Sequence, residues 1–249
     1  MTASAPTRPG VAGAVLGVVG EVLITLGVLL GLFVVWQLWW TDVVADAQQA
    51  EVVEGLDWAR EPTAPTPDPS PDAAAEPELR RDAAPVPSTP EALTTFATLQ
   101  VPRWGTDYIR PITEGTSRRE VLDVLGLGHY EGTAMPGAVG NFAVAGHRTT
   151  YGKPLNRVEE LALGDPLVVQ TADTWYVYRV TSTQVVLPQD VEVIAPVPGD
   201  PTGVPTAATL TLTTCHPMFS ARERFIVHAE LDYWLPVADG TPAELTGGA

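Results

Sequence analysis

The sequence predicts a mainly β domain, a barrel or sandwich with a few short helices, preceded by an apolar helix and a proline-rich linker. Short runs rich in Val, Thr, Ile and aromatic residues recur through the C-terminal part of the chain, separated by Gly, Pro and Asp turns. The domain that they define, 96–237, is long enough for one substantial core and too short for two.

The first element is an almost wholly apolar run at residues 11–40, in which Glu21 and Gln37 are the main interruptions. Val22 to Trp40 alone provides nineteen residues, which is enough to span a bilayer. A cleaved signal peptide has an apolar core of only about 7–15 residues. The run therefore predicts a retained transmembrane anchor, with tryptophans suited to the outer interface at Trp36, Trp39 and Trp40.

The charges on either side of this anchor favour one orientation. Arg8 is the only basic residue before the span, whereas acidic residues predominate after it. Under the positive-inside rule, residues 1–10 form a short cytoplasmic N-terminus. We therefore expect a single-pass protein of the cell membrane with its β domain outside the cell, in contact with lipid through its N-terminal helix.

Residues 41–95 have the composition of an extracellular linker. Between residues 42 and 95 there are twelve acidic and three basic side chains, and nine prolines lie between Pro62 and Pro90. Such a segment cannot bury enough apolar surface to fold, and its prolines favour an extended spacer. At the other end of the chain, 238–249 is predicted to be a flexible tail.

Within the domain, a helix is predicted at Ser117–Leu125, where Ser117 and Glu120 have capping-box spacing. A second short helix is predicted at Asn156–Leu163. Five strands are predicted, at Leu167–Thr171, Trp175–Val180, Thr183–Leu187, Thr209–Thr214 and Phe225–Leu231.

The net charge of −16 excludes some classes of partner. The domain is acidic and lacks the basic stripe that phosphate binding requires, so nucleic acid is not expected. The chain has no P-loop, dinucleotide fingerprint or zinc-ligand spacing. Asp190, Glu192 and Asp200 lie in the loop between Leu187 and Leu210 without forming an acidic cluster. No metal or cofactor is therefore predicted.

The candidate nucleophile is Cys215, the only cysteine of the chain, at the end of the β-patterned run TLTLTTC. A single thiol outside the cell cannot form an internal disulfide, which favours a reactive role over that of a small core residue. The thiolate is the attacking form, and a nearby cation such as Arg224, nine residues on, would help to keep it ionised. A guanidinium could also stabilise the oxyanion that forms when an amide is attacked. The alternative for Arg224 is a surface ion pair, and the adjacent Glu223 keeps that alternative open.

His147 is the best candidate for the base, because it follows a second apolar run, NFAVAGHR. His216 is the next residue after the cysteine and would point to the opposite strand face. His228 lies too far along its strand from Arg224 to serve the same sulfur. His129 lies in a Gly-rich turn, where a solvated or loop-packing histidine is expected.

These motifs resemble those of sortases, the membrane-anchored cysteine transpeptidases of Gram-positive bacteria. The sortase motif TLxTC matches Thr211 to Cys215, and NFAVAGHRTTYG and RFIVHAEL match in order and spacing over about the last 140 residues. Within the family, GHRTTYG and CHPMFSARERFIV look most like class E, the housekeeping type of high-GC actinobacteria.

The resemblance implies an eight-stranded sortase barrel with His147, Cys215 and Arg224 as the catalytic triad, and Thr213 and Thr214 in substrate binding. It also implies cleavage of a C-terminal sorting signal of LPxTG or LAxTG type between Thr and Gly, through a cysteine thioester. The partners would be secreted proteins that bear this signal and a peptidoglycan-precursor amine as acceptor, or a pilin lysine in a polymerising member.

Three other interpretations stay open. A cysteine hydrolase would use the same three residues with water as the acceptor. An L,D-transpeptidase is also extracellular and rich in β structure, but its SxGCxR-type motif is missing here. A non-catalytic binding domain could retain the barrel without turnover, although none of the three residues has been lost.

Overall fold

The computed structural model describes residues 11–59 and 78–246. The chain divides into two compact units, of which the first ends at Thr41 and the second begins at Asp42. The predicted cytoplasmic segment 1–10 and much of the proline-rich part of the linker lie outside the described residues.

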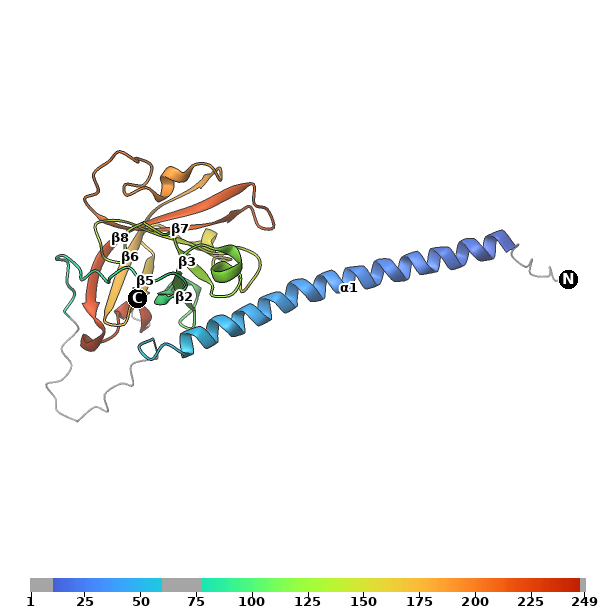
Figure 1. Cartoon of the computed structure of the whole chain (residues 1–249), viewed down its shortest axis with the longest axis horizontal. Coiled ribbons are helices and arrows are strands. Elements are labelled where there is room, and N and C mark those ends of the chain that lie inside the picture. The colour runs from blue at the N-terminus through green and yellow to red at the C-terminus, as the bar shows by residue number, and fades with distance from the viewer. Residues whose placement is uncertain (1–10, 60–77, 247–249) are drawn as a thin grey trace, which may run out of the picture. The chain divides into compact units, whose positions relative to one another are not determined.

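Helix α1 runs from Val11 to Glu54 and contains a stretch long and apolar enough to cross a membrane. Figure 1 shows it as one long helix. Large apolar side chains along the first unit are exposed, among them Leu23 at 63% and Phe33 at 52%. Such exposure suits a helix whose side chains face lipid rather than a protein core.

The last part of α1, in the second unit, is helical where the sequence predicted only a linker. Ala45, Gln49 and Val53 recur every four residues, so they lie on one face, and all three are buried. The Gln49 side chain donates a hydrogen bond to the carbonyl of Tyr151 at 3.0 Å, and Arg110 pairs with Asp46 at 2.9 Å. The acidic composition of this segment gave no indication that one face of it would be buried.

The second unit contains a closed barrel of eight strands, as the sortase resemblance implies. The strands are β1 (Thr95–Gln100), β2 (Ile109–Glu114), β3 (Leu127–His129), β4 (Gly140–Ala145), β5 (Pro166–Gln170), β6 (Thr174–Val186), β7 (Ala208–His216) and β8 (Glu223–Pro236). Around the barrel their order is β1-β2-β3-β4-β7-β8-β6-β5, with β5 pairing back to β1. The pairs β2–β3 and β4–β7 are parallel, and the other neighbours are antiparallel.

Strands β5 to β8 form at the predicted runs of β-branched and aromatic residues, whereas β1, β2 and β3 were not predicted. Two runs predicted as separate strands, 175–180 and 183–187, are joined in β6, which pairs with β8 through an irregularity between Val180 and Ser182. The side chains of Leu99, Tyr178 and Leu212 are fully buried in one core cluster. Closure of the barrel removes the exposed strand edges that an open sheet would leave.

Both predicted helices are shorter than expected. The first is a five-residue π-helical turn, Arg118–Leu122, labelled η2, and the Ser117 side chain makes no capping hydrogen bond. Instead, the Ser117 carbonyl accepts hydrogen bonds from the N–H groups of Val121 and Leu122. The second is only a 3-10 turn, η3, at Val158–Glu160. Capping-box spacing therefore marked the start of η2 but not its length.

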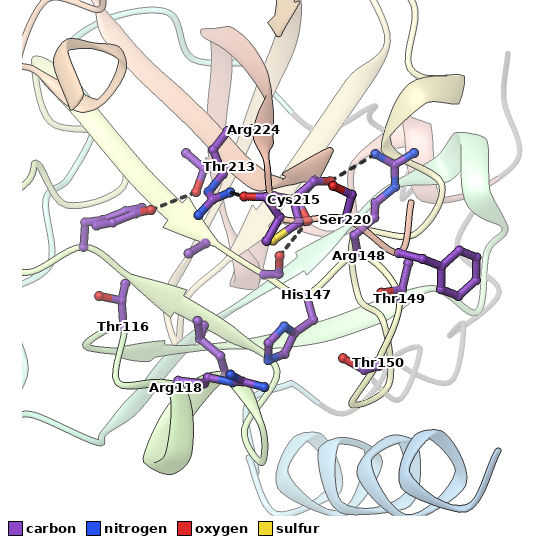
Figure 2. A pocket seen from close by; sticks show the side chains of 17 residues that line it. Thr116, Arg118, His147, Arg148, Thr149, Thr150, Thr213, Cys215, Ser220 and Arg224 are labelled. Atoms are coloured by element: carbon purple, nitrogen blue, oxygen red, sulfur yellow. Dashed lines mark hydrogen bonds between the residues drawn. The ribbon is translucent and has the colours of Figure 1, made fainter. Parts of the chain in front are cut away.

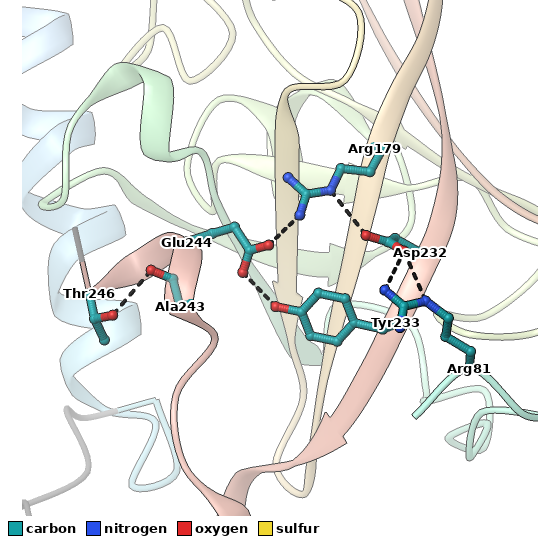
Figure 3. Close-up of polar contacts among 7 residues, drawn as sticks. All are labelled: Arg81, Arg179, Asp232, Tyr233, Ala243, Glu244 and Thr246. Atoms are coloured by element: carbon teal, nitrogen blue, oxygen red, sulfur yellow. Dashed lines mark hydrogen bonds and ion pairs between the residues drawn. The ribbon is translucent and has the colours of Figure 1, made fainter. Parts of the chain in front are cut away.

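The C-terminal segment through Thr246 is held against the barrel, in contrast to the predicted flexible tail. Figure 3 shows Glu244 between Arg179 of β6 and Tyr233 of β8, with contacts to both. Asp232, on the same strand, pairs with Arg179 and with Arg81, each at 3.2 Å. Burial and the bond to Glu244 raise the pKa of Tyr233. These side-chain contacts outweigh the polar composition of the segment.

We expect Asp165→Asn to destabilise the barrel in a pH-dependent way. Burial alone would raise the pKa of Asp165, but Arg103 and the N–H of Ala162 hydrogen-bond the carboxylate and hold its pKa below the usual range. A lowered folded pKa adds stability above the unfolded value of about 4, and this stability is lost as pH falls through the folded pKa. Urea unfolding of the wild type and the variant should show a lower midpoint for the variant at pH 7. In acid the two midpoints should become equal. Equal midpoints at pH 7 would contradict the expectation.

Candidate active site

Three strand ends bring the predicted site residues together. Strands β4 and β7 are parallel, so their carboxyl ends reach the same edge of the barrel, where Ala145 lies opposite Thr213. His147 follows two residues after Ala145, and Cys215 two residues after Thr213. Strand β8 returns antiparallel to β7 and places Arg224 directly across from Cys215. Residues far apart in the sequence thus meet through strand pairing.

These side chains line a groove of about 630 Å³. Figure 2 shows His147, Cys215 and Arg224 around it, with Arg118 and Thr150 on the same walls. The thiol of Cys215 is partly exposed and is not in a disulfide. The nucleophile is therefore accessible to a ligand, unlike a cysteine buried in the core.

A close-packed glycine positions the loop that carries His147. A Cβ at Gly146 would lie 2.6 Å from the side chain of Leu127 and 3.0 Å from that of Leu155, so a larger residue would force these buried leucines to move. Beyond it, Leu155 donates its N–H to the His147 carbonyl at 3.0 Å, and the ring of Tyr151 lies 5.2 Å from the imidazole. The backbone on both sides of His147 is therefore fixed.

The imidazole of His147 bonds to a carboxylate that the sequence did not single out. Its Nε2 lies 2.7 Å from Oδ1 of Asp123, just after η2. In the described part of the chain, no hydrogen bond joins His147 to Cys215. Hydrogen bonds to a catalytic base often form only with substrate present, so this arrangement is compatible with an acid-base role.

Arg224 is positioned by main-chain carbonyls rather than by an acidic partner. Its Nη1 donates to the carbonyls of Ala221 at 3.0 Å and Glu223 at 2.9 Å. Within the described residues, no ion pair links Arg224 to Glu223 or to another carboxylate. The guanidinium therefore keeps its positive charge available to a ligand in the groove.

Arg148, the residue after His147, supports the groove from behind. Its side chain is 1% exposed and donates to the carbonyls of Asn156 at 2.9 Å and Cys215 at 3.5 Å. It also pairs with the half-exposed Glu159 at 2.9 Å. Arg148 thus ties the end of β7 to the loop that follows β4.

The other three histidines lie outside the reacting geometry. His216 points away from the thiol, as predicted, and pairs with Glu159 at 3.0 Å. His228 contacts Thr211 at 2.9 Å, and burial lowers its pKa. The expectation for His129 was wrong: it is fully buried in β3, with Nδ1 2.6 Å from Glu114. The neighbouring strands cover what looked like an exposed turn.

The two predicted substrate-binding threonines line the groove but are already hydrogen-bonded. Thr214 donates from its hydroxyl to the Gly146 carbonyl at 2.7 Å. Thr213 shares a 3.0 Å hydrogen bond with the hydroxyl of Tyr130. Each oxygen retains acceptor capacity, and the Thr214 hydrogen bond links β7 to the loop that holds His147.

The β6–β7 loop carries the three acidic residues considered for metal binding. Asp190 accepts a hydrogen bond from the N–H of Leu187, and Asp200 accepts one from the hydroxyl of Thr202. Each carboxylate therefore stabilises the turn in which it lies. Among the described residues, no group of three or more His, Cys, Asp or Glu side chains could hold a metal ion. The loop is tied to the barrel by Asn141, whose amide donates to the carbonyls of Val193 and Ala195.

A closed barrel with a thiol, an imidazole and a guanidinium on one groove is the architecture of the cysteine transpeptidase class that the motifs indicate. The family model of the sortase domain matches residues 99–232. The chain belongs to the sortase family.

Class E members are among the relatives. Sortase SrtE1 of Streptomyces coelicolor is 38% identical over 96% of this chain, which spans 63% of that protein's length. Sortase SrtE2 of the same organism is 34% identical over 90% of this chain and 85% of its own length. These matches confirm the predicted family and its class E character.

Solved structures agree with this fold. The SrtA sortase from Actinomyces oris is 44% identical, with a TM-score of 0.64 over 67% of this chain and 96% of that chain. Sortase E1 from Streptomyces coelicolor, solved with a tripeptide in the active site, is 39% identical, with a TM-score of 0.56 over 61% of this chain and 96% of that chain.

Sequence reasoning missed two residues of the site, Asp123 and Arg148. Asp123 lies within the segment predicted as a helix, where nothing in the local pattern points toward His147. Arg148 did carry a signal, because it directly follows the candidate base in the sequence. An arginine is nevertheless expected in solvent unless its partners are known.

We expect Arg148→Met to cost about 2–3 kcal/mol of unfolding free energy, because a buried guanidinium and its hydrogen bonds are lost together. Glu159→Gln is the matched control, since it weakens the same pair from its half-exposed side, where an ion pair contributes at most about 1 kcal/mol. Urea denaturation followed by tryptophan fluorescence measures both. Equal losses would contradict the structural role assigned to Arg148.

Proposed function

We propose that this protein is a membrane-anchored sortase that cleaves a C-terminal sorting signal between Thr and Gly and transfers the carrier protein to a cell-wall amine. The observation that carries the proposal is the cross-strand pairing of Cys215 with Arg224, beside His147, on one accessible groove. Acyl transfer needs a nucleophile, a proton-transfer group and a positive charge at the oxyanion, and these three residues are of the right types.

In the first half of the proposed reaction, the Cys215 thiolate attacks the carbonyl carbon of the Thr–Gly bond. The protonated imidazole of His147 gives its proton to the leaving amine as the C–N bond breaks. The carrier protein then remains bound to the cysteine as a thioester. The accessible thiol and the neighbouring guanidinium support this step.

In the second half, an acceptor amine attacks the thioester carbonyl while neutral His147 takes up its proton. The C–S bond breaks, a new amide forms and the thiolate is restored. Arg224 stabilises the oxyanion in both halves, because main-chain carbonyls hold it without neutralising its charge. Thr213 and Thr214 contact the bound peptide from β7.

The substrate is a secreted protein that ends in an LAxTG or LPxTG signal, and the acceptor is an amine of a peptidoglycan precursor. The class E resemblance implies the LAxTG form. A pilin lysine is the alternative acceptor. The tripeptide in the active site of the Streptomyces coelicolor sortase E1 supports peptide binding in this groove.

We propose that the first unit anchors the enzyme in the cell membrane through lipid contact, with the N-terminus in the cytoplasm and the barrel outside. Helix α1 is long and apolar enough to span a bilayer. A catalytic domain on the outer side would meet both secreted proteins and cell-wall precursors.

We expect the purified full-length chain in detergent to cleave LAxTG and LPxTG peptides between Thr and Gly and to join the acyl part to an added amine. Mass spectrometry of the products, with and without the amine, separates transfer from hydrolysis. Cys215→Ala should abolish the reaction, and His147→Ala and Arg224→Ala should lower turnover at least about 100-fold.

The control is Glu160→Gln, which alters a surface ion pair with Arg157 outside the groove and should retain activity. Hydrolysis alone, even at high amine concentration, would favour a cysteine hydrolase. No turnover of either peptide and no thioester trapped on Cys215 would favour another substrate or a binding role.

We expect alkaline phosphatase fused after the C-terminus to be active in intact bacteria, because that enzyme folds only in an oxidising compartment outside the cytoplasm. The same fusion lacking residues 11–40 should be inactive and should leave the membrane fraction. Activity without that helix, or inactivity of the full fusion, would argue against the proposed anchor and orientation.

A further inference from the structure

Asp123 hydrogen-bonds to one ring nitrogen of His147, the residue whose imidazole the proposed reaction uses. Its Oδ1 lies 2.7 Å from Nε2 of His147, and both side chains are only 16% exposed. An ionised carboxylate can only accept hydrogen bonds, so the proton of this contact lies on Nε2. This hydrogen bond fixes the orientation of the ring, and Nδ1 is the ring nitrogen that is left to exchange protons with the reacting groups.

The position of the carboxylate is itself fixed by the turn that carries it. The Asp123 N–H donates to the carbonyl of Arg118 at 2.8 Å, which closes the π-helical turn η2. That turn is packed on the barrel through Val121, which is fully buried. The backbone of Asp123 is therefore anchored to the barrel by this hydrogen bond and by the packing of Val121.

A surface ion pair with Arg118 is the alternative role for Asp123, and the geometry disfavours it. The Nε of Arg118 lies 3.6 Å from the same carboxylate oxygen, and the Arg118 side chain is 73% exposed. An exposed pair at this distance contributes little. The contact with His147 is shorter and better shielded from water, so it determines the orientation of the carboxylate.

Among the described residues, Asp123 is the side chain that hydrogen-bonds to the His147 ring. The ring of Tyr151 packs beside the imidazole at 5.2 Å. The other charged or titratable side chains that line the groove are Arg118, Tyr130, Arg148, Cys215 and Arg224. Among the described residues lining the groove none is a carboxylate, so Asp123 supplies the negative charge next to His147.

We propose that Asp123 is a positioning residue for His147, an inference that rests on the acid-base role proposed above for that histidine. Asp123 accepts the hydrogen bond from the N–H at Nε2 and directs Nδ1 toward the reacting atoms. In the protonated imidazole Nδ1 carries the second ring proton, which it gives to the leaving amine as the C–N bond breaks. In the neutral ring Nδ1 then takes a proton from the attacking acceptor amine. No proton passes to Asp123 in either step.

The test compares Asp123→Asn with the wild type in full-length chains. Asparagine has the same size but no charge, and its amide N–H₂ can face the ring and favour the other tautomer. We expect kcat to fall about 100-fold while KM changes less than about twofold, because peptide binding does not require the tautomer. An unchanged kcat, or a change in KM alone, would overturn the proposal.

Asp165→Asn is the matched control. Asp165 is also a poorly exposed, ion-paired carboxylate, at 12% exposure, but it lies outside the groove. The folded fraction of this variant should turn over peptide at the wild-type kcat. An equal loss of kcat in both variants would show a general stability effect and would overturn the positioning role.

Two further measurements separate this inference from the proposed function. Full activity of His147→Ala would overturn the acid-base role of His147, and the present proposal with it. Full activity of Asp123→Asn beside an inactive His147→Ala would overturn only the present proposal. Nitrogen-15 NMR of the histidine rings, which needs no substrate, should find the proton of the neutral His147 ring on Nε2 in the wild type and shared or on Nδ1 in Asp123→Asn. Identical ring signals would contradict the inference.

Discussion

The parallel pairing of β4 with β7 is the constraint on which the site depends. Parallel strands end at the same sheet edge, so this ladder brings His147 and Cys215 to one place although the sequence separates them widely. The antiparallel return of β8 then sets Arg224 opposite Cys215. A one-residue slip in either ladder would turn the functional side chains to the other barrel face.

Buried polar contacts make this edge rigid. Thr214 bonds to the carbonyl of Gly146, and Arg148 bonds to the carbonyl of Cys215, so the loop after β4 and the end of β7 are joined in both directions. Asn141, at the other end of β4, holds the β6–β7 loop through two hydrogen bonds. Preorganised groups of this kind need little rearrangement when a substrate arrives, which is the condition under which electrostatic stabilisation is most effective.

Charge is distributed in a way that fits the proposed chemistry. The chain as a whole is strongly acidic, yet the described residues that line the groove carry guanidinium groups and no carboxylate. The carboxylates near the site, Asp123 and Glu159, lie behind His147 and Arg148, where they hold these side chains in place. The groove thus retains positive charge toward a developing oxyanion while its supporting side chains are paired.

The sequence by itself determined the family, the strands β5 to β8 and the three candidate residues, because the TLxTC run and the apolar runs before His147 and after Arg224 are local patterns with fixed spacing. Only the tertiary structure decided which side chains support them. Asp123, Arg148 and the buried pair of His129 with Glu114 depend on contacts between segments distant in sequence, which local spacing does not encode. For the same reason, the helix through Glu54 was predicted as linker and the anchored C-terminal segment as a flexible tail. Composition records charge and proline content, but it does not record the hydrogen-bond partners of Gln49 and Glu244.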